Sequence, residues 1–63
     1  MENAELTARE RDVLRLVAAG LYDKEIARDL GITVGTVREY NYSIRQKLGA
    51  RNRVETVLRT LSP

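Results

Sequence analysis

The chain has 63 residues, a formal net charge of +2 and neither cysteine nor histidine. This length allows one small domain, and the missing residue types exclude disulfides, thiolate metal sites and the usual general base. No metal or other cofactor is therefore expected. Because no signal-peptide pattern and no apolar run of membrane-spanning length is visible, the sequence predicts a soluble, cytoplasmic, mostly helical domain.

Residues 1–5 are interpreted as a flexible polar lead-in, and residues 6–63 as one domain whose helices are separated by glycines. Thr7 and Glu10 have the spacing of a capping box, which predicts the start of a first helix. Gly20 can adopt the left-handed conformation at its end. The apolar positions of this helix recur at helical spacing: Val13, Leu14, Val17 and Leu21.

A second and a third helix are predicted on either side of a very short turn. Asp23 can cap the second helix or complement its dipole, and Gly31 ends it. Thr33 can cap a third helix that continues to about Leu48 and ends at Gly49. Two helices joined by about three residues form the pattern of a helix-turn-helix, whose second helix enters the DNA major groove.

A fourth helix is predicted after Gly49, because Asn52 and Glu55 repeat the capping spacing. One face of this helix is apolar and consists of Val54, Val57, Leu58 and Leu61. Such a face can complete the core, contact a second copy of the chain, or bind another protein.

Charge is distributed unevenly along the chain. Residues 1–32 contain five Lys/Arg against seven Asp/Glu, a balance of −2, whereas residues 33–63 contain six against two, a balance of +4. This asymmetry indicates a surface for a polyanion, although a solvated charged face would give the same pattern.

A helical wheel of the third helix separates an inner from an outer face. The inner positions are Val37, Ile44 and Leu48, with Tyr40 to one side as a packing residue. Arg38, Glu39 and Tyr42 fall on the outer side, where an arginine can make a bidentate contact to guanine. Asn41 falls on the inner side, where an unpaired amide is unfavourable. The sequence therefore predicts that Asn41→Leu stabilises the domain by about 1 kcal/mol.

Residues Leu6 to Val57 closely resemble the LuxR-type (FixJ/NarL-type) DNA-binding domain. The blocks LTARERDVLRLVAAGL, KEIARDLGIT, TVR and KLGARNRVETV match the family in order and spacing without a gap. The resemblance implies an all-α, four-helix domain containing a helix-turn-helix, which binds DNA as the output domain of a bacterial transcription regulator. A receiver or sensor domain usually precedes it and is not in this chain.

The resemblance also implies roles for particular positions. The recognition helix, at about residues 34–48, would contact bases through Arg38, Glu39 and Tyr42. Contacts to the DNA backbone would come from Lys24, Thr33, Thr36, Arg45, Lys47, Arg51 and Arg53. A homodimer on double-stranded DNA, on an inverted-repeat operator, would form through Val54, Val57, Leu58 and Leu61. The chain departs from the family pattern at Tyr22, Tyr40 and Asn41.

Other functions remain open from the sequence. A sigma-factor region-4-like module shares the opening pattern LTxRE and would contact a promoter together with RNA polymerase, which is also a candidate partner of a LuxR-type domain. A helical protein-interaction module would use the apolar face of the fourth helix. An enzyme is the poorest hypothesis, because the sequence has no histidine or cysteine, no phosphate-binding glycine loop and no paired carboxylates at an identifiable pocket.

Overall fold

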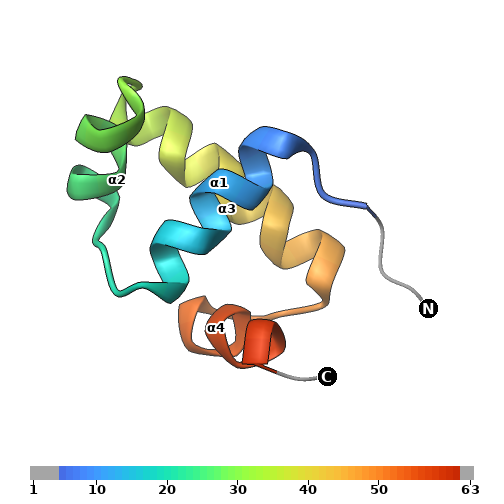
Figure 1. Ribbon diagram of the computed structural model, residues 1–63. Coiled ribbons are helices and arrows are strands. Elements are labelled where there is room, and N and C mark those ends of the chain that lie inside the picture. Colours follow the sequence, from blue (N-terminus) through green and yellow to red (C-terminus); the bar gives the residue numbers. More distant parts are fainter. Residues whose placement is uncertain (1–4, 62–63) are drawn as a thin grey trace.

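The computed structural model describes residues 5–61 and contains four helices joined by short loops (Figure 1). The helices are α1 (Ala8–Ala18), α2 (Asp23–Leu30), α3 (Val34–Leu48) and α4 (Arg53–Leu61). Residues 5–61 contain no strand, and the predicted all-α, four-helix fold is confirmed. Apart from Glu5, the predicted lead-in lies outside the described residues, as do residues 62 and 63. None of the helices in the described range is long and apolar enough to cross a membrane.

The helices begin where side chains satisfy their free backbone N–H groups. In α1, the Glu10 N–H donates to Thr7 Oγ1 at 3.1 Å and the Thr7 N–H donates to Glu10 Oε1 at 2.8 Å, which is the predicted capping box. In α3, Thr33 Oγ1 accepts from the Thr36 N–H at 3.1 Å, as predicted. The sequence therefore placed both helix starts from local chemistry alone.

The start of α2 differs from the prediction. Tyr22, and not Asp23, is the residue before the first helical turn, and its N–H donates to Glu25 Oε1 at 2.7 Å. Asp23 lies within the first turn, where its charge still complements the helix dipole. Of the two roles that the sequence allowed for Asp23, capping is excluded, because its carboxylate is bound by residues of α3 and α4, and complementing the dipole remains.

The core lies where α3 crosses the other helices (Figure 1). Val13, Ile26, Val37 and Ile44 are fully buried, and they come from α1, α2 and α3. Because α3 contacts α1, α2 and α4, its inner face is held rigidly against the rest of the domain.

The turn between α2 and α3 consists of three residues, Gly31 to Thr33. Gly31 has a φ of 70°, a left-handed conformation that glycine adopts without a steric penalty. The Ile32 N–H donates to the Ala27 carbonyl at 3.0 Å, and the Ile32 side chain packs on the core. The hydrogen bond to Ala27 and the packing of Ile32 thus fix the turn on the core, which sets the angle between α2 and α3.

Candidate nucleic-acid interface

The outer face of α3 presents the three residues that were predicted to contact bases. Arg38 and Glu39 are exposed, and Tyr42 is 60% exposed. The opposite face of α3 buries Val37 and Ile44. The three side chains therefore belong to a surface that is free to meet a partner while the helix behind it is fixed by the core.

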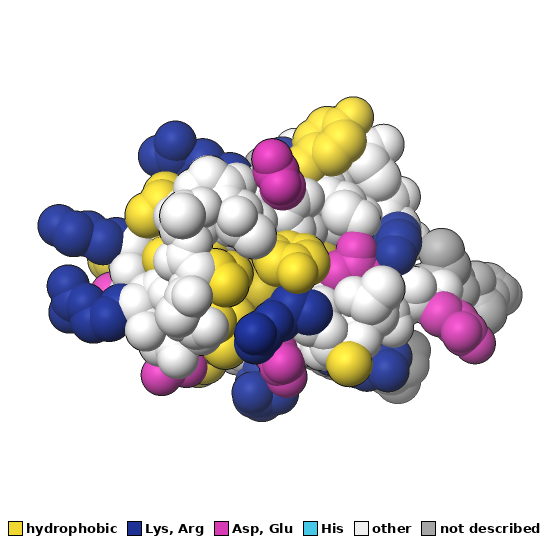
Figure 2. Space-filling model, turned by 90° about the horizontal axis from the view of Figure 1, so that it is seen from above, with side chains coloured by type: hydrophobic (Ala, Val, Ile, Leu, Met, Phe, Trp, Pro, Cys, Tyr) yellow, Lys and Arg dark blue, Asp and Glu magenta, His cyan; other side chains and the backbone are white. Residues whose placement is uncertain are grey.

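Several of the predicted phosphate contacts lie around this face. Lys24 and Thr33 are exposed, and Thr36 and Arg45 are half-buried. Thr33 Oγ1 and Thr36 Oγ1 lie 2.9 Å apart at the start of α3, so both hydroxyls lie beside the N-terminal end of this helix. Seen from above, lysine and arginine side chains project from the end of the molecule where α2 lies (Figure 2). Positive charge and a helix N-terminus at one end form a surface suited to phosphate.

Lys47 is bound differently from the prediction. Its Nζ donates to Glu10 Oε1 at 2.8 Å, and Ser43 Oγ donates to Glu10 Oε2 at 2.5 Å. Glu10 is only 4% exposed. Through these bonds to Glu10, Lys47 and Ser43 connect the C-terminal half of α3 to the first turn of α1. This arrangement argues against the predicted phosphate contact, because releasing the Lys47 amine would leave a buried carboxylate without its charged partner.

The ionisation of Glu10 reflects two opposing effects. Burial by itself raises the pKa of a carboxyl group. Here the hydrogen bonds from Lys47, Ser43 and the Thr7 N–H outweigh burial and lower the pKa of Glu10 from 4.5 to about 2. Glu10 is therefore ionised at neutral pH, which keeps the ion pair with Lys47 charged.

The two arginines before and at the start of α4 are also paired within the domain. Arg51 NH2 lies 2.9 Å from Glu55 Oε2, but its side chain is 86% exposed and accessible to a phosphate. Arg53 NH1 donates to Asp23 Oδ1 at 2.8 Å and NH2 donates to the Leu21 carbonyl at 2.6 Å. Arg53 therefore joins α4 to the loop before α2, which argues against its predicted phosphate contact.

Asn41 is buried, at 8% exposure, and its Nδ2 donates to Asp23 Oδ1 at 3.1 Å. The expectation that Asn41→Leu stabilises the domain assumed an unpaired amide, and the structure shows a paired one. The expected sign therefore reverses.

We now expect Asn41→Leu to lower the free energy of unfolding by about 1–2 kcal/mol, because it removes a donor from a partly buried carboxylate. Thermal unfolding followed by circular dichroism measures the change. Gln46→Leu, on the exposed side of the same helix, is the control and should change stability by less than about 0.5 kcal/mol. A higher melting temperature for Asn41→Leu than for the wild type would show that Arg53 alone satisfies Asp23.

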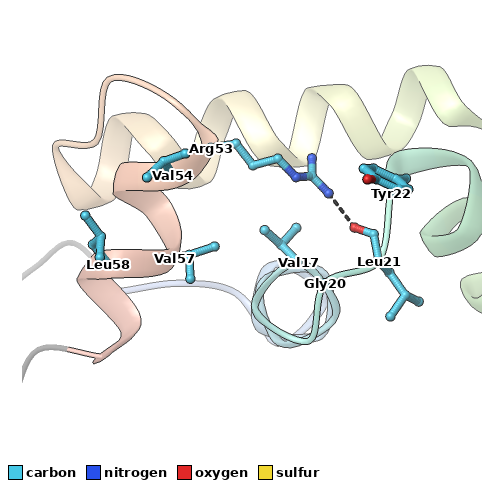
Figure 3. A pocket seen from close by; sticks show the side chains of 8 residues that line it. All are labelled: Val17, Gly20, Leu21, Tyr22, Arg53, Val54, Val57 and Leu58. Atoms are coloured by element: carbon cyan, nitrogen blue, oxygen red, sulfur yellow. Dashed lines mark hydrogen bonds between the residues drawn. The ribbon is translucent and has the colours of Figure 1, made fainter.

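The apolar residues of α4 divide into two groups. Val54, Leu58 and Leu61 are 68%, 52% and 74% exposed, whereas Val57 is half-buried and packs on the core. A hollow of about 350 Å³ lies between α4 and the α1–α2 loop, and Figure 3 shows Arg53 reaching across it to the Leu21 carbonyl. The predicted dimer surface is thus reduced to three exposed side chains, because Val57 belongs to the core.

Two residues that organise this surface were not predicted to do so. Glu10 was recognised only as a capping residue, and Asp23 only as a residue that caps α2 or complements its dipole. Their other partners lie between 18 and 37 residues away in the sequence, at Asn41, Arg53, Ser43 and Lys47. No local pattern points to these pairs, although a buried carboxylate in an all-helical domain needs cationic or hydroxyl partners.

A pinned three-residue turn between two helices, with a polar and cationic outer face on the second helix, defines a helix-turn-helix DNA-binding domain. The family model of the bacterial regulatory proteins of the luxR family matches residues 4–60, and the chain belongs to this family. It is a DNA-binding domain of the kind found in bacterial transcription regulators, and the prediction that it is not an enzyme is confirmed by this membership.

The relatives include regulators from several bacteria. The transcriptional regulatory protein DesR of Bacillus subtilis is 51% identical over 55 residues, which are 87% of this chain and 28% of DesR. The nitrate/nitrite response regulator NarL of Escherichia coli is 44% identical over 54 residues, 86% of this chain and 25% of NarL. This chain thus spans about a quarter of the length of these relatives.

A solved structure shows the same fold. In the ligand–DNA complex of Vibrio cholerae VqmA, a region with 36% sequence identity superposes with a TM-score of 0.89 and covers 97% of this chain and 27% of VqmA. The LuxR-type resemblance of the sequence is therefore confirmed at the level of both family and fold.

Proposed function

We propose that this domain binds double-stranded DNA in a sequence-specific way by placing α3 in the major groove. The observation that supports this most directly is the two-sided character of α3, whose inner face is core and whose outer face exposes Arg38, Glu39 and Tyr42. Arg38 would make a bidentate contact to guanine, Glu39 would accept from a cytosine amine, and Tyr42 would contact a base edge one turn further on. Similarity to a protein solved in complex with DNA supports DNA binding.

The DNA backbone would be contacted on both sides of α3. Lys24, Thr33, Thr36 and Arg45 lie at or near the exposed side of the helix-turn-helix, and Arg51 extends from the loop before α4. Their contribution would be mostly independent of sequence and sensitive to salt, since it depends on charge and on counterion release. Lys47 and Arg53 are left out of this set because of their internal partners.

The exposed side chains Val54, Leu58 and Leu61 support a homodimer that forms on DNA. Three apolar side chains on a nine-residue helix offer a small contact, which fits association that depends on DNA. Two recognition helices related by a two-fold axis would then contact an inverted repeat with half-sites about one helical turn, or about 10 bp, apart.

Leu58→Asp should lower the affinity for the operator, because a charge would be placed in the contact between two copies. The expected loss is at least about tenfold, or about 1.4 kcal/mol. Thr60→Asp adds the same charge to α4 without removing an apolar side chain and is the control. Circular dichroism must show that both variants are folded. Equal operator affinity for the wild type and Leu58→Asp would exclude this side chain from a dimer contact.

Because the relatives are much longer than this chain, we also propose that the domain is the output part of a larger cytoplasmic regulator with a receiver or sensor domain.

Selection of bound duplexes from a random pool, with the domain alone, tests the proposed function. Enrichment of an inverted repeat without RNA polymerase is the expected result, and it would exclude a sigma-factor region-4-like module. No enrichment of any sequence would contradict specific binding, and footprints limited to one half-site at saturation would contradict the dimer.

A further inference from the structure

Asp23 lies at the junction of three helices and faces donors from two of them. Its Oδ1 accepts from Asn41 Nδ2 at 3.1 Å and from Arg53 NH1 at 2.8 Å. The same carboxylate approaches Arg38, with Oδ2 lying 4.0 Å from Arg38 Nε. Since donors from α3 and α4 hold Oδ1, the orientation of the carboxylate is set, and Oδ2 lies on the side of Arg38.

The atom of Arg38 that comes closest to Asp23 is Nε, which leaves the outer end of the guanidinium unoccupied. The side chain of Arg38 is 74% exposed, whereas that of Asp23 is 26% exposed. An arginine whose Nε side faces a carboxylate keeps both terminal nitrogens for the O6 and N7 acceptors of a guanine. A carboxylate in this place also offsets the charge of Arg38, which weakens its attraction to phosphates, whereas its contact to a base depends on geometry as well as on charge.

We propose that Asp23 is a positioning residue that sets the orientation of Arg38 and thereby the base preference of the domain. Arg53 and Asn41 hold the carboxylate by hydrogen bonds. The carboxylate attracts Arg38 Nε across 4.0 Å, which favours orientations of the guanidinium in which the terminal nitrogens are directed to the groove. An arginine that is already aligned in the free protein loses less side-chain entropy when it binds a base edge. The affinity therefore rises for the DNA sequence that places a guanine opposite Arg38, and not for other sequences. This inference rests on the proposed role of Arg38 as a base contact.

The test is a double-mutant cycle with Asp23→Asn and Arg38→Ala. Affinities are measured by fluorescence anisotropy for the selected operator and for operators substituted at single base pairs. Asp23→Asn keeps the shape of the side chain and an acceptor for Arg53 but removes the charge. Asp29→Asn removes the same charge from an exposed position of α2 and is the matched control.

In the wild-type background, Asp23→Asn should lower discrimination about three- to fivefold at the base pair contacted by Arg38, a size typical of a partly exposed ion pair. It should not weaken binding to unrelated DNA, and Asp29→Asn should leave discrimination unchanged. In the Arg38→Ala background, Asp23→Asn should have no further effect on discrimination. A uniform loss on all sequences, or the same loss with and without Arg38, would overturn the inference and leave Asp23 with a purely structural role.

Failure of the proposed function itself has a different outcome. If Arg38→Ala does not change the preference at any base pair, Arg38 is not a base contact, and both the role and its positioning are rejected. If Arg38→Ala relaxes one base pair and Asp23→Asn does not, only the positioning is rejected.

A measurement on the free wild-type protein keeps the inference testable even if Asp23→Asn does not fold. In NMR spectra, the Nε–Hε group of Arg38 should exchange with water more slowly and reorient less than that of the exposed Arg28. Equal exchange and equal mobility of the two arginines would show that Asp23 does not hold Arg38.

Discussion

Glu10→Gln is expected to lower the free energy of unfolding by about 2–3 kcal/mol at pH 7. The carboxylate is buried, and it accepts from Lys47, Ser43 and the Thr7 N–H, so the neutral amide loses the charge that makes these bonds strong. A domain of this size is stabilised by only about 0.05–0.15 kcal/mol per residue. The substitution should therefore remove a large part of its stability, which chemical denaturation measures directly.

The effect of Glu10→Gln should depend on pH in a defined direction. The pKa of Glu10 in the folded domain is about 2, below its value of 4.5 in the absence of the fold. The stabilisation is therefore fully present above pH 4.5 and is lost as the pH falls through about 2. The difference in unfolding free energy between the wild type and Glu10→Gln should narrow over the same interval.

Asp12→Asn provides the matched control for Glu10. It removes a charge from the same helix, but the ion pairs of Asp12 with Arg9 and Arg15 lie on the surface at 3.5 and 3.3 Å. This variant should lose less than about 1 kcal/mol. A stability difference for Glu10→Gln that is the same at pH 7 and pH 2.5 would contradict the assignment of the stabilisation to an ionised Glu10.

Arg38→Ala is expected to lower operator affinity by about 1–3 kcal/mol and to relax the preference for one base pair. Arg38 is exposed in the first half of α3, on the face that we place in the groove. Removing the Arg38 side chain should lower the affinity for unrelated DNA by less, because no guanine lies opposite Arg38 at a fixed position there. Affinities for the operator and for a scrambled duplex, measured over a series of salt concentrations, separate the two contributions.

Arg45→Ala is the comparison variant, since Arg45 forms no ion pair within residues 5–61. It should weaken the operator and the scrambled duplex by similar factors and lower the salt slope by about one counterion. Lys47, another of the backbone contacts that the resemblance implied, is unsuitable for this comparison because its removal would also disturb Glu10. An equal loss on both duplexes for Arg38→Ala would make Arg38 a phosphate contact. Base recognition would then fall to Tyr42, and also to Arg45 if Arg45→Ala weakens the operator more than the scrambled duplex.

The sequence by itself determined the features of this domain that depend on neighbouring residues. The capping box of α1, the Thr33 cap of α3 and the glycines that end α2 and α3 were all predicted, because backbone N–H groups and left-handed φ angles are satisfied locally. The outer face of α3 followed from helical periodicity in the same way. The family followed from blocks of sequence that keep this order and spacing.

Only the tertiary structure decided which polar side chains stay available at the surface and which pair with each other. Lys47 and Arg53 looked like free cations, and Asn41 like an unpaired amide, until Glu10 and Asp23 were brought beside them from other helices. A helical wheel gives the direction of a side chain but not the partner that another helix places there. Long cationic side chains are flexible enough to reach either a phosphate or a buried carboxylate. The choice between them is made by the packing of α1, α2 and α4 around α3.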